Sequence, residues 1–160
     1  MLDTSQKGFD KLISMIGALE VGMLTTANAD GVLRSRPMAT QKTTDGKLYF
    51  FTSKTSLKVE GAGADASVNV SYADPGNQTY VSVSGRARIS RGKNKIREIW
   101  TESARRWFPQ GPDDERLAVL EVDITKADFW DIDAQTMVEL LNREASGDEI
   151  VAATDHRKLS

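Results

Sequence analysis

The sequence predicts a small antiparallel β-barrel decorated with helices, a mainly β fold. Many short segments rich in β-favouring residues follow one another at close spacing. Turn sequences separate them, among them Asn28-Ala-Asp-Gly31, Thr43-Thr-Asp-Gly46 and Asp74-Pro-Gly-Asn77. No repeat, low-complexity segment or linker divides the 160 residues. We therefore expect a single domain over residues 1–160, built as a barrel.

The chain is expected to begin with an amphipathic helix over residues 5–19, where Ser5 is of the type that caps helices. Apolar residues recur in it at helical spacing, namely Phe9, Leu12, Ile13, Ile16 and Leu19. Strands are then expected over residues 21–27, 32–40 and 47–52. The third strand is apolar on both faces, with Leu48 and Phe50 on one and Tyr49 and Phe51 on the other. Both faces need cover, which a barrel or a dimer interface would supply.

The remaining elements follow from period-two alternation and from turn residues. A short helix is expected near residues 55–63, and strands over 67–73, 79–90 and 117–124. Residues 94–104 have a helical pattern, residues 109–114 that of an irregular loop, and residues 129–131 are expected to close the sheet. The polar tail over residues 142–160 is expected to fray.

Composition excludes several classes of function. A hydrophobic content of 39%, 28% charged residues and a net charge of −2 are typical of a soluble globular domain. Nucleic acid is not expected as a partner, because binding it requires many contacts from Lys and Arg to phosphate. The chain has no cysteine and one histidine, His156 in the polar tail, so neither thiolate catalysis nor a metal site is expected.

The beginning of the sequence does not have the pattern of a signal peptide. Lys7, Asp10 and Lys11 interrupt the first segment, and the most apolar stretch, residues 12–19, is too short to span a bilayer. We therefore expect a cytoplasmic protein with no membrane partner.

A polar, cationic pattern between Arg34 and Lys58 indicates phosphate binding. Arg36 lies on one expected strand, and hydroxyl side chains fill residues 52–56 after the next. The free N–H groups of a helix N-terminus attract anions, and Lys58 falls in that first turn. The alternatives are that Arg36 is a solvated or salt-bridged residue and that the hydroxyls form a strand end and a helix cap.

Two further features bear on the ligand. Trp107 and Phe108 lie in an expected loop, where they either fill the core or stack on a planar ligand. The chain has no Walker loop and no Gly-x-Gly-x-x-Gly fingerprint, so phosphate binding would not be of the P-loop or Rossmann type. It also has no evident acid–base machinery, so a bound cofactor would carry any hard chemistry.

The order and spacing of several short motifs resemble those of one family. They are Arg36-Pro37-Met38, Tyr49-Phe50-Phe51-Thr52-Ser53, Ser56-Leu57-Lys58, Tyr80 to Gly85, Trp100, Trp107-Phe108-Pro109 and Phe129-Trp130-Asp131. Over residues 10–131 the chain is similar to the bacterial general stress proteins of the pyridoxamine-phosphate-oxidase-like, flavin-binding split-barrel group. The resemblance implies a six-stranded antiparallel split β-barrel and a homodimer. It also implies FMN, or alternatively FAD, bound in a cleft between the two subunits.

The resemblance also implies a set of cofactor-binding residues. Arg36 would lie at the flavin-binding strand, with Pro37, Met38, Ala39 and Gln41 along the isoalloxazine edge. Phe51, Thr52 and Ser53 would hold the ribityl phosphate, Ser56 and Lys58 would bind the phosphate, and Trp107 and Phe108 would flank the ring from the partner subunit.

The sequence departs from the family at three points. Leu57 replaces an arginine that would donate to phosphate, Tyr80 replaces a glutamine near the flavin, and no substrate-binding arginine follows Trp130. Vitamin B6 oxidation is therefore not expected. The hypothesis is a flavin-dependent oxidoreductase of unknown substrate, with no catalytic residue assigned. The alternatives are a non-catalytic flavin carrier or sensor and, more remotely, a barrel that binds deazaflavin or haem.

Overall fold

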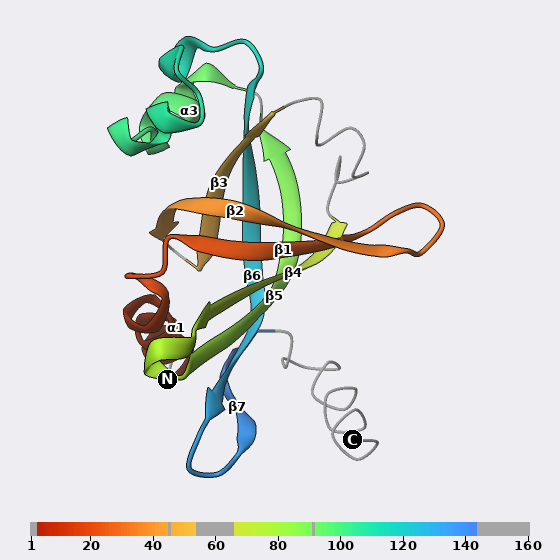
Figure 1. Cartoon of the computed structure of the whole chain (residues 1–160), viewed down its shortest axis with the longest axis vertical. Helices are drawn as coiled ribbons and strands as arrows, with labels where there is room; N and C mark the ends of the chain where they lie inside the picture. The colour runs from red at the N-terminus through yellow and green to blue at the C-terminus, as the bar shows by residue number, and fades with distance from the viewer. Residues whose placement is uncertain (1–2, 45, 54–65, 91, 144–160) are drawn as a thin grey trace.

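The computed structural model describes residues 3–44, 46–53, 66–90 and 92–143. Within them, seven strands form one antiparallel sheet, and a pairing between β3 and β6 closes six of them into a barrel (Figure 1). The strands are β1 (Val21–Ala27), β2 (Leu33–Thr44), β3 (Lys47–Ser53), β4 (Ala66–Asp74), β5 (Thr79–Ser90), β6 (Leu117–Asp131) and β7 (Thr136–Asn142). The expected antiparallel split β-barrel is confirmed, with β7 as an added strand beside β6.

The helices lie around the barrel. They are α1 (Asp3–Ile16), α3 (Lys93–Ile99) and the 3₁₀ segments η1 (Pro75–Asn77), η2 (Glu102–Arg106) and η3 (Gly111–Asp113). Figure 1 shows α1 near one end of the barrel and α3 near the other. Leu12 and Ile16 of α1 are buried in the barrel core, so the helix adds apolar cover at its end. No helix within the described ranges is long and apolar enough to cross a membrane.

Strand β3 separates two hydrophobic clusters. Leu48 and Phe50 belong to the barrel core, whereas Tyr49 and Phe51 pack outside the barrel with α3 and the start of β6. The alternation predicted from the sequence is therefore confirmed, and one chain covers both faces of this strand. A dimer interface is not needed to bury Tyr49 and Phe51.

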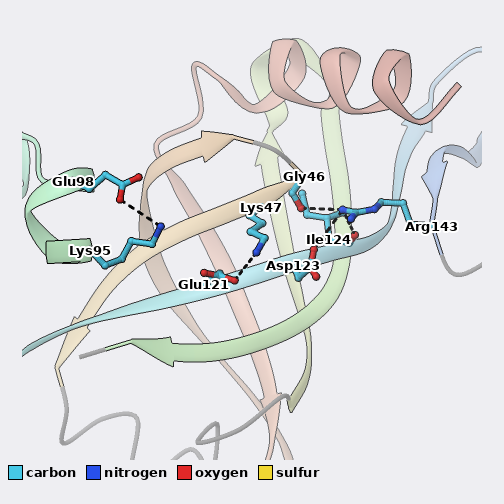
Figure 2. Close-up of polar contacts among 8 residues, drawn as sticks. All are labelled: Gly46, Lys47, Lys95, Glu98, Glu121, Asp123, Ile124 and Arg143. Atoms are coloured by element: carbon cyan, nitrogen blue, oxygen red, sulfur yellow. Dashed lines mark hydrogen bonds and ion pairs between the residues drawn. The ribbon is translucent and has the colours of Figure 1, made fainter. Parts of the chain in front are cut away.

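Polar contacts fix the seam where the barrel closes (Figure 2). Lys47 Nζ on β3 donates to Glu121 Oε2 on β6 at 2.9 Å, and this hydrogen bond raises the pKa of Lys47. Arg143, just after β7, donates from Nη1 to the carbonyl oxygens of Gly46 at 3.3 Å and Ile124 at 3.0 Å. The turn between β2 and β3 is thereby held against β6.

Several predicted boundaries differ from the structure. The first helix spans Asp3–Ile16 rather than residues 5–19, so Ser5 lies inside it. The predicted helix over 94–104 is interrupted at Trp100, which adopts extended backbone with ψ of 137° between α3 and η2. β1 and β5 match the predicted ranges. The predicted helix near 55–63 and the tail beyond residue 143 lie outside the described residues.

Two strands extend several residues beyond their predicted ends. The pairing of β2 with β3 shifts register between Thr40 and Lys42, which lets β2 continue to Thr44. β6 runs on from Ile124 to Asp131 past another register shift, so residues 129–131 belong to this strand. A bulge inserts a residue and bends a strand without ending it.

Candidate functional site

A pocket of about 270 Å³ lies between β2, β3 and the segment around η2. It is lined by Val21, Pro37, Met38, Ala39, Gln41, Phe51, Thr52, Ser53, Ala104, Trp107 and Phe108. None of these side chains is charged. A largely apolar concave site with a few polar groups is the usual form of a small-molecule site.

The floor of the pocket comes from β2, whose neighbouring residues point to opposite faces of the sheet. Toward the barrel core, Thr40 Oγ1 lies 2.7 Å from the hydroxyl oxygen of Tyr72, and Arg36 Nη2 donates to Thr26 Oγ1 at 2.9 Å. Burial raises the pKa of Tyr72 to about 12, so this hydroxyl stays neutral. These contacts fix the face of β2 opposite the pocket.

Aromatic residues form the wall facing that floor. The ring of Phe51 lies 5.5 Å from that of Trp100 and 6.3 Å from that of Phe108, the latter edge to face. Trp107 is different because 60% of it is exposed. Its ring is therefore available to a planar ligand, whereas Phe51 is fixed by packing.

Hydrogen bonds hold the η2 segment in place. Thr101 Oγ1 donates to Gln41 Oε1 at 3.1 Å, and Gln41 Nε2 donates to the Ala39 carbonyl at 3.2 Å. Within the segment, Glu102 accepts from Arg105 Nε at 2.9 Å and from Trp100 Nε1 at 3.0 Å. These contacts, the one with Arg105 foremost, lower the pKa of Glu102. The segment is thus braced internally and joined to β2.

The polar edge of the pocket lies at the end of β3. Thr52 is buried, with 8% exposure, and Ser53 follows it at the strand terminus. Their hydroxyls can donate or accept hydrogen bonds. The lining residues that the structure describes therefore offer an apolar, aromatic surface for a planar ring, bordered by hydroxyls. None of them carries an acidic or basic side chain for acid–base chemistry. Within the described part of the chain there is also no cluster of three His, Asp or Glu side chains that could hold a metal.

The structure brings together nine of the twelve residues that the sequence singled out. They are Pro37, Met38, Ala39, Gln41, Phe51, Thr52, Ser53, Trp107 and Phe108. Arg36 is not among the lining residues, because its guanidinium lies on the Thr26 side of β2. Ser56 and Lys58 lie outside the described residues. Trp107 and Phe108 line the pocket of their own chain, whereas the expectation had placed them against the flavin of the partner subunit.

Two lining residues were not identified from the sequence. Val21 enters the site because β1 pairs with β2 in a register that sets it opposite Ala39. Ala104 enters because η2 packs it against the second hydrophobic cluster. Both follow from tertiary pairing, and no motif in the sequence marks them.

Comparison with known proteins agrees with this architecture. Residues 7–148 match the family described as pyridoxamine 5'-phosphate oxidase like. The chain therefore belongs to the pyridoxamine 5'-phosphate oxidase-like family. The resemblance found in the short motifs is thereby confirmed at the level of the family.

Particular relatives can be named. The chain is 29% identical over 129 residues to the protein bli-3 of Neurospora crassa, a match that covers 74% of this chain and 62% of that protein. Its structure is similar to a protein related to general stress protein 26 from Clostridium acetobutylicum, with a TM-score of 0.71, 14% identity and coverage of 84% and 94%. It is also similar to the general stress FMN/FAD binding protein of Xanthomonas citri, with a TM-score of 0.66, 25% identity and coverage of 78% and 89%.

Proposed function

We propose that the chain binds a flavin nucleotide, FMN with FAD as the alternative, in the pocket between β2, β3 and η2. The observation that carries the proposal is the uncharged, aromatic pocket in which nine of the residues implied by the family resemblance converge. The similarity to a general stress protein of X. citri described as FMN/FAD binding supports the same class of cofactor.

The pocket fits the ring of a flavin better than the whole nucleotide. Sites that enclose drug-sized ligands span about 300–1,000 Å³, and this one measures about 270 Å³. Phe51, Trp107 and Phe108 provide faces and edges for a planar ring. The rest of the nucleotide would extend beyond this pocket.

Each group of residues has a proposed role. Pro37, Ala39 and Gln41 lie along the edge of the ring, and Thr52 and Ser53 hydrogen-bond the ribityl chain. Ser56 and Lys58 would bind the phosphate, as the sequence suggests. The side chain of Arg36 hydrogen-bonds Thr26. Arg36 would therefore hold strand β2 in position rather than contact the flavin with its side chain.

A bound flavin supplies the redox chemistry, while the chain binds and orients it. A flavin-dependent oxidoreductase is the first proposed function, with its substrate open. A non-catalytic flavin carrier or sensor is the second, favoured by one observation: none of the described lining residues has an acidic or basic side chain.

A homodimer with the cofactor at the interface is part of the proposal. Beside the pocket, β1 exposes the apolar side chains of Val21 and Met23, at 45% and 39% exposure, and these residues pair with Ala39 and Pro37 of the pocket. Exposed apolar surface of this kind favours association. A cytoplasmic location is also proposed, since the chain has no cysteine that would form disulfides.

The absorption spectrum of the purified full chain, mixed with FMN and passed through gel filtration, tests the cofactor. Flavin bands that travel with the protein are expected; a Soret band, or protein free of flavin after mixing, would contradict the proposal. Addition of NAD(P)H without oxygen then separates the two functions. Bleaching of the flavin bands favours the oxidoreductase, and unchanged bands favour the carrier or sensor.

A further inference from the structure

A second pocket, of about 380 Å³, lies across neighbouring strands away from the flavin pocket. It is lined by Thr25, Thr26, Ala27, Leu33, Ser67, Val68, Asn69, Ser84, Gly85, Arg86, Thr125 and Lys126. The two pockets share no lining residue. We propose that this second pocket binds a small organic anion through a phosphate or carboxylate head group.

The charges of the pocket have one sign. Arg86 and Lys126 are the charged side chains among its described lining residues, and neither forms an ion pair with another described residue. Asp123 lies opposite Arg86 in the pairing of β5 with β6, but its carboxylate is 3.5 Å from Arg143 instead (Figure 2). Two cations that form no ion pair with a described carboxylate favour an anionic ligand.

The nearest acidic residue along β6 is Asp128, which is not a lining residue. Burial raises the pKa of its carboxyl group, an effect that the charge of Lys126 opposes. Asp128 and Lys126 lie two residues apart on one face of β6, opposite Ser82 and Ser84 of β5. The ammonium group of Lys126 has three N–H donors and forms no ion pair with another described residue. Lys126 therefore keeps a donor for the pocket.

Hydroxyl and amide groups surround the cations. Asn69 Nδ2 donates to Ser82 Oγ at 2.9 Å and to Ser84 Oγ at 3.3 Å, which orients the Ser84 hydroxyl. Ser67 and Thr25 lie on the neighbouring strands β4 and β1. Hydroxyls and charged donors together can bind the several oxygens of a phosphate or carboxylate.

The backbone is irregular at this pocket in a way that brings two successive residues to it. The pairing of β5 with β6 shifts register between Ser84 and Gly85, and both Thr125 and Lys126 line the pocket. A side chain at Gly85 would collide with the carbonyl oxygen of Asp123. Bulges re-aim side chains in this manner, and here the result is a threonine and a lysine at one site.

The size and the apolar residues of the pocket indicate that the anion carries an organic part. Its volume of about 380 Å³ far exceeds the share of liquid volume that one water occupies, roughly 30 Å³. Ala27, Leu33 and Val68 supply apolar surface beside the polar groups. A small ring or short chain bearing one anionic group matches both features.

Amide NMR on the full, flavin-loaded chain tests the proposal with four probes: phenyl phosphate, benzoate, inorganic phosphate and the neutral benzyl alcohol. We expect saturable shifts for at least one aromatic anion at residues 25–27, 67–69, 84–86 and 125–126. Lys126→Ala and Arg86→Ala should each weaken that binding about tenfold or more, the loss of a charge-assisted hydrogen bond. Arg88→Ala on the same strand and Lys7→Ala on α1, both exposed and outside the pocket, are the matched controls.

Whichever aromatic anion binds more tightly identifies the head group. The proposal is wrong if neither anion binds saturably, if benzyl alcohol or inorganic phosphate binds as tightly, or if the control variants lose as much affinity. Thermal melts establish that each variant is folded. Because the flavin absorbance is recorded in the same samples, failure of this pocket is distinguishable from failure of the flavin site.

Discussion

The hydroxyl of Thr101 donates a hydrogen bond of 3.1 Å to the side-chain oxygen of Gln41. Thr101 precedes the segment that carries Trp107 and Phe108, and Gln41 belongs to β2. This contact between distant parts of the chain therefore joins the aromatic wall of the proposed flavin pocket to its floor.

Thr101→Val should loosen this wall. A typical intramolecular hydrogen bond contributes about 0.5–1.5 kcal/mol, so we expect FMN affinity to fall by a factor of about 2 to 13, measured by flavin fluorescence titration. The control is Ser103→Ala, which removes only the hydroxyl 3.0 Å from that of Thr101 and leaves the contact with Gln41. Equal affinities for wild type and Thr101→Val would show that this hydrogen bond does not position the site.

Trp107→Ala should weaken flavin binding without unfolding the protein. Loss of aromatic stacking costs about 1–3 kcal/mol, whereas replacing so exposed a residue changes the free energy of unfolding by about 0.5 kcal/mol or less. Calorimetric titration with FMN and urea unfolding measure the two effects. Met137→Ala, an exposed apolar residue on β7, is the matched control. Unchanged FMN affinity in Trp107→Ala would remove the ring from the site.

Asp114 should make stability depend on acid pH. It is 2% exposed and accepts hydrogen bonds from the guanidinium of Arg116 at 2.8 Å and, with a smaller effect, from its backbone N–H at 2.9 Å, which lower the pKa of Asp114 to about 2. A lowered pKa stabilises the fold fully above the ordinary value of 3.8, and this stabilisation is lost as the pH falls toward about 2.

Melting temperatures between these two pH values check this prediction. The wild-type melting temperature should fall more steeply with acidification than that of Asp114→Asn, which lacks the titrating group. Asp113→Asn is the control, because the Asp113 side chain is 72% exposed. Parallel curves for wild type and Asp114→Asn would contradict the assignment.

The proposed homodimer can be tested at the exposed face of β1. Light scattering of the wild-type chain should give about twice the 17.6 kDa of one chain. Met23→Glu should shift the protein toward monomer, because burying an unpaired charge in an apolar interface is unfavourable. Ile132→Glu, at an exposed apolar residue after β6, should leave the mass unchanged. A monomeric wild type at micromolar concentration would rule the dimer out.

The strands could be predicted where alternation and turn residues were strong. β3 shows this, because its two apolar faces predicted two covered surfaces and the structure supplies both. β7 was missed because the turn before it has no glycine or proline. Instead, Asp131 Oδ1 accepts from the N–H groups of Asp133 and Ala134, and Gln135 adopts a φ of 54°. The side chain of Asp131 thus stabilises a turn that lacks the usual glycine or proline.

Nine of the twelve candidate residues line one pocket, but the geometry of that pocket could not be predicted from the sequence. The side chain of Arg36 lies on the face of β2 opposite the pocket because Arg36 pairs with the buried Leu24 of β1, a register that one sequence does not specify. Trp107 lines the pocket of its own chain and follows the break in the helical segment at Trp100. Both outcomes depend on tertiary pairing rather than on local pattern.

The central claim is that a flavin occupies the pocket between β2, β3 and η2, and blocking that pocket tests it most directly. Ala39 lines the pocket, so Ala39→Phe places a ring where the flavin would lie. Ala73→Phe makes the same change at an exposed residue of β4 outside the pocket.

The decisive measurement is calorimetric titration of FMN into wild type and both variants, with circular dichroism to establish folding. We predict saturable binding to wild type and Ala73→Phe and no detectable binding to folded Ala39→Phe. Wild-type affinity in folded Ala39→Phe would contradict the account.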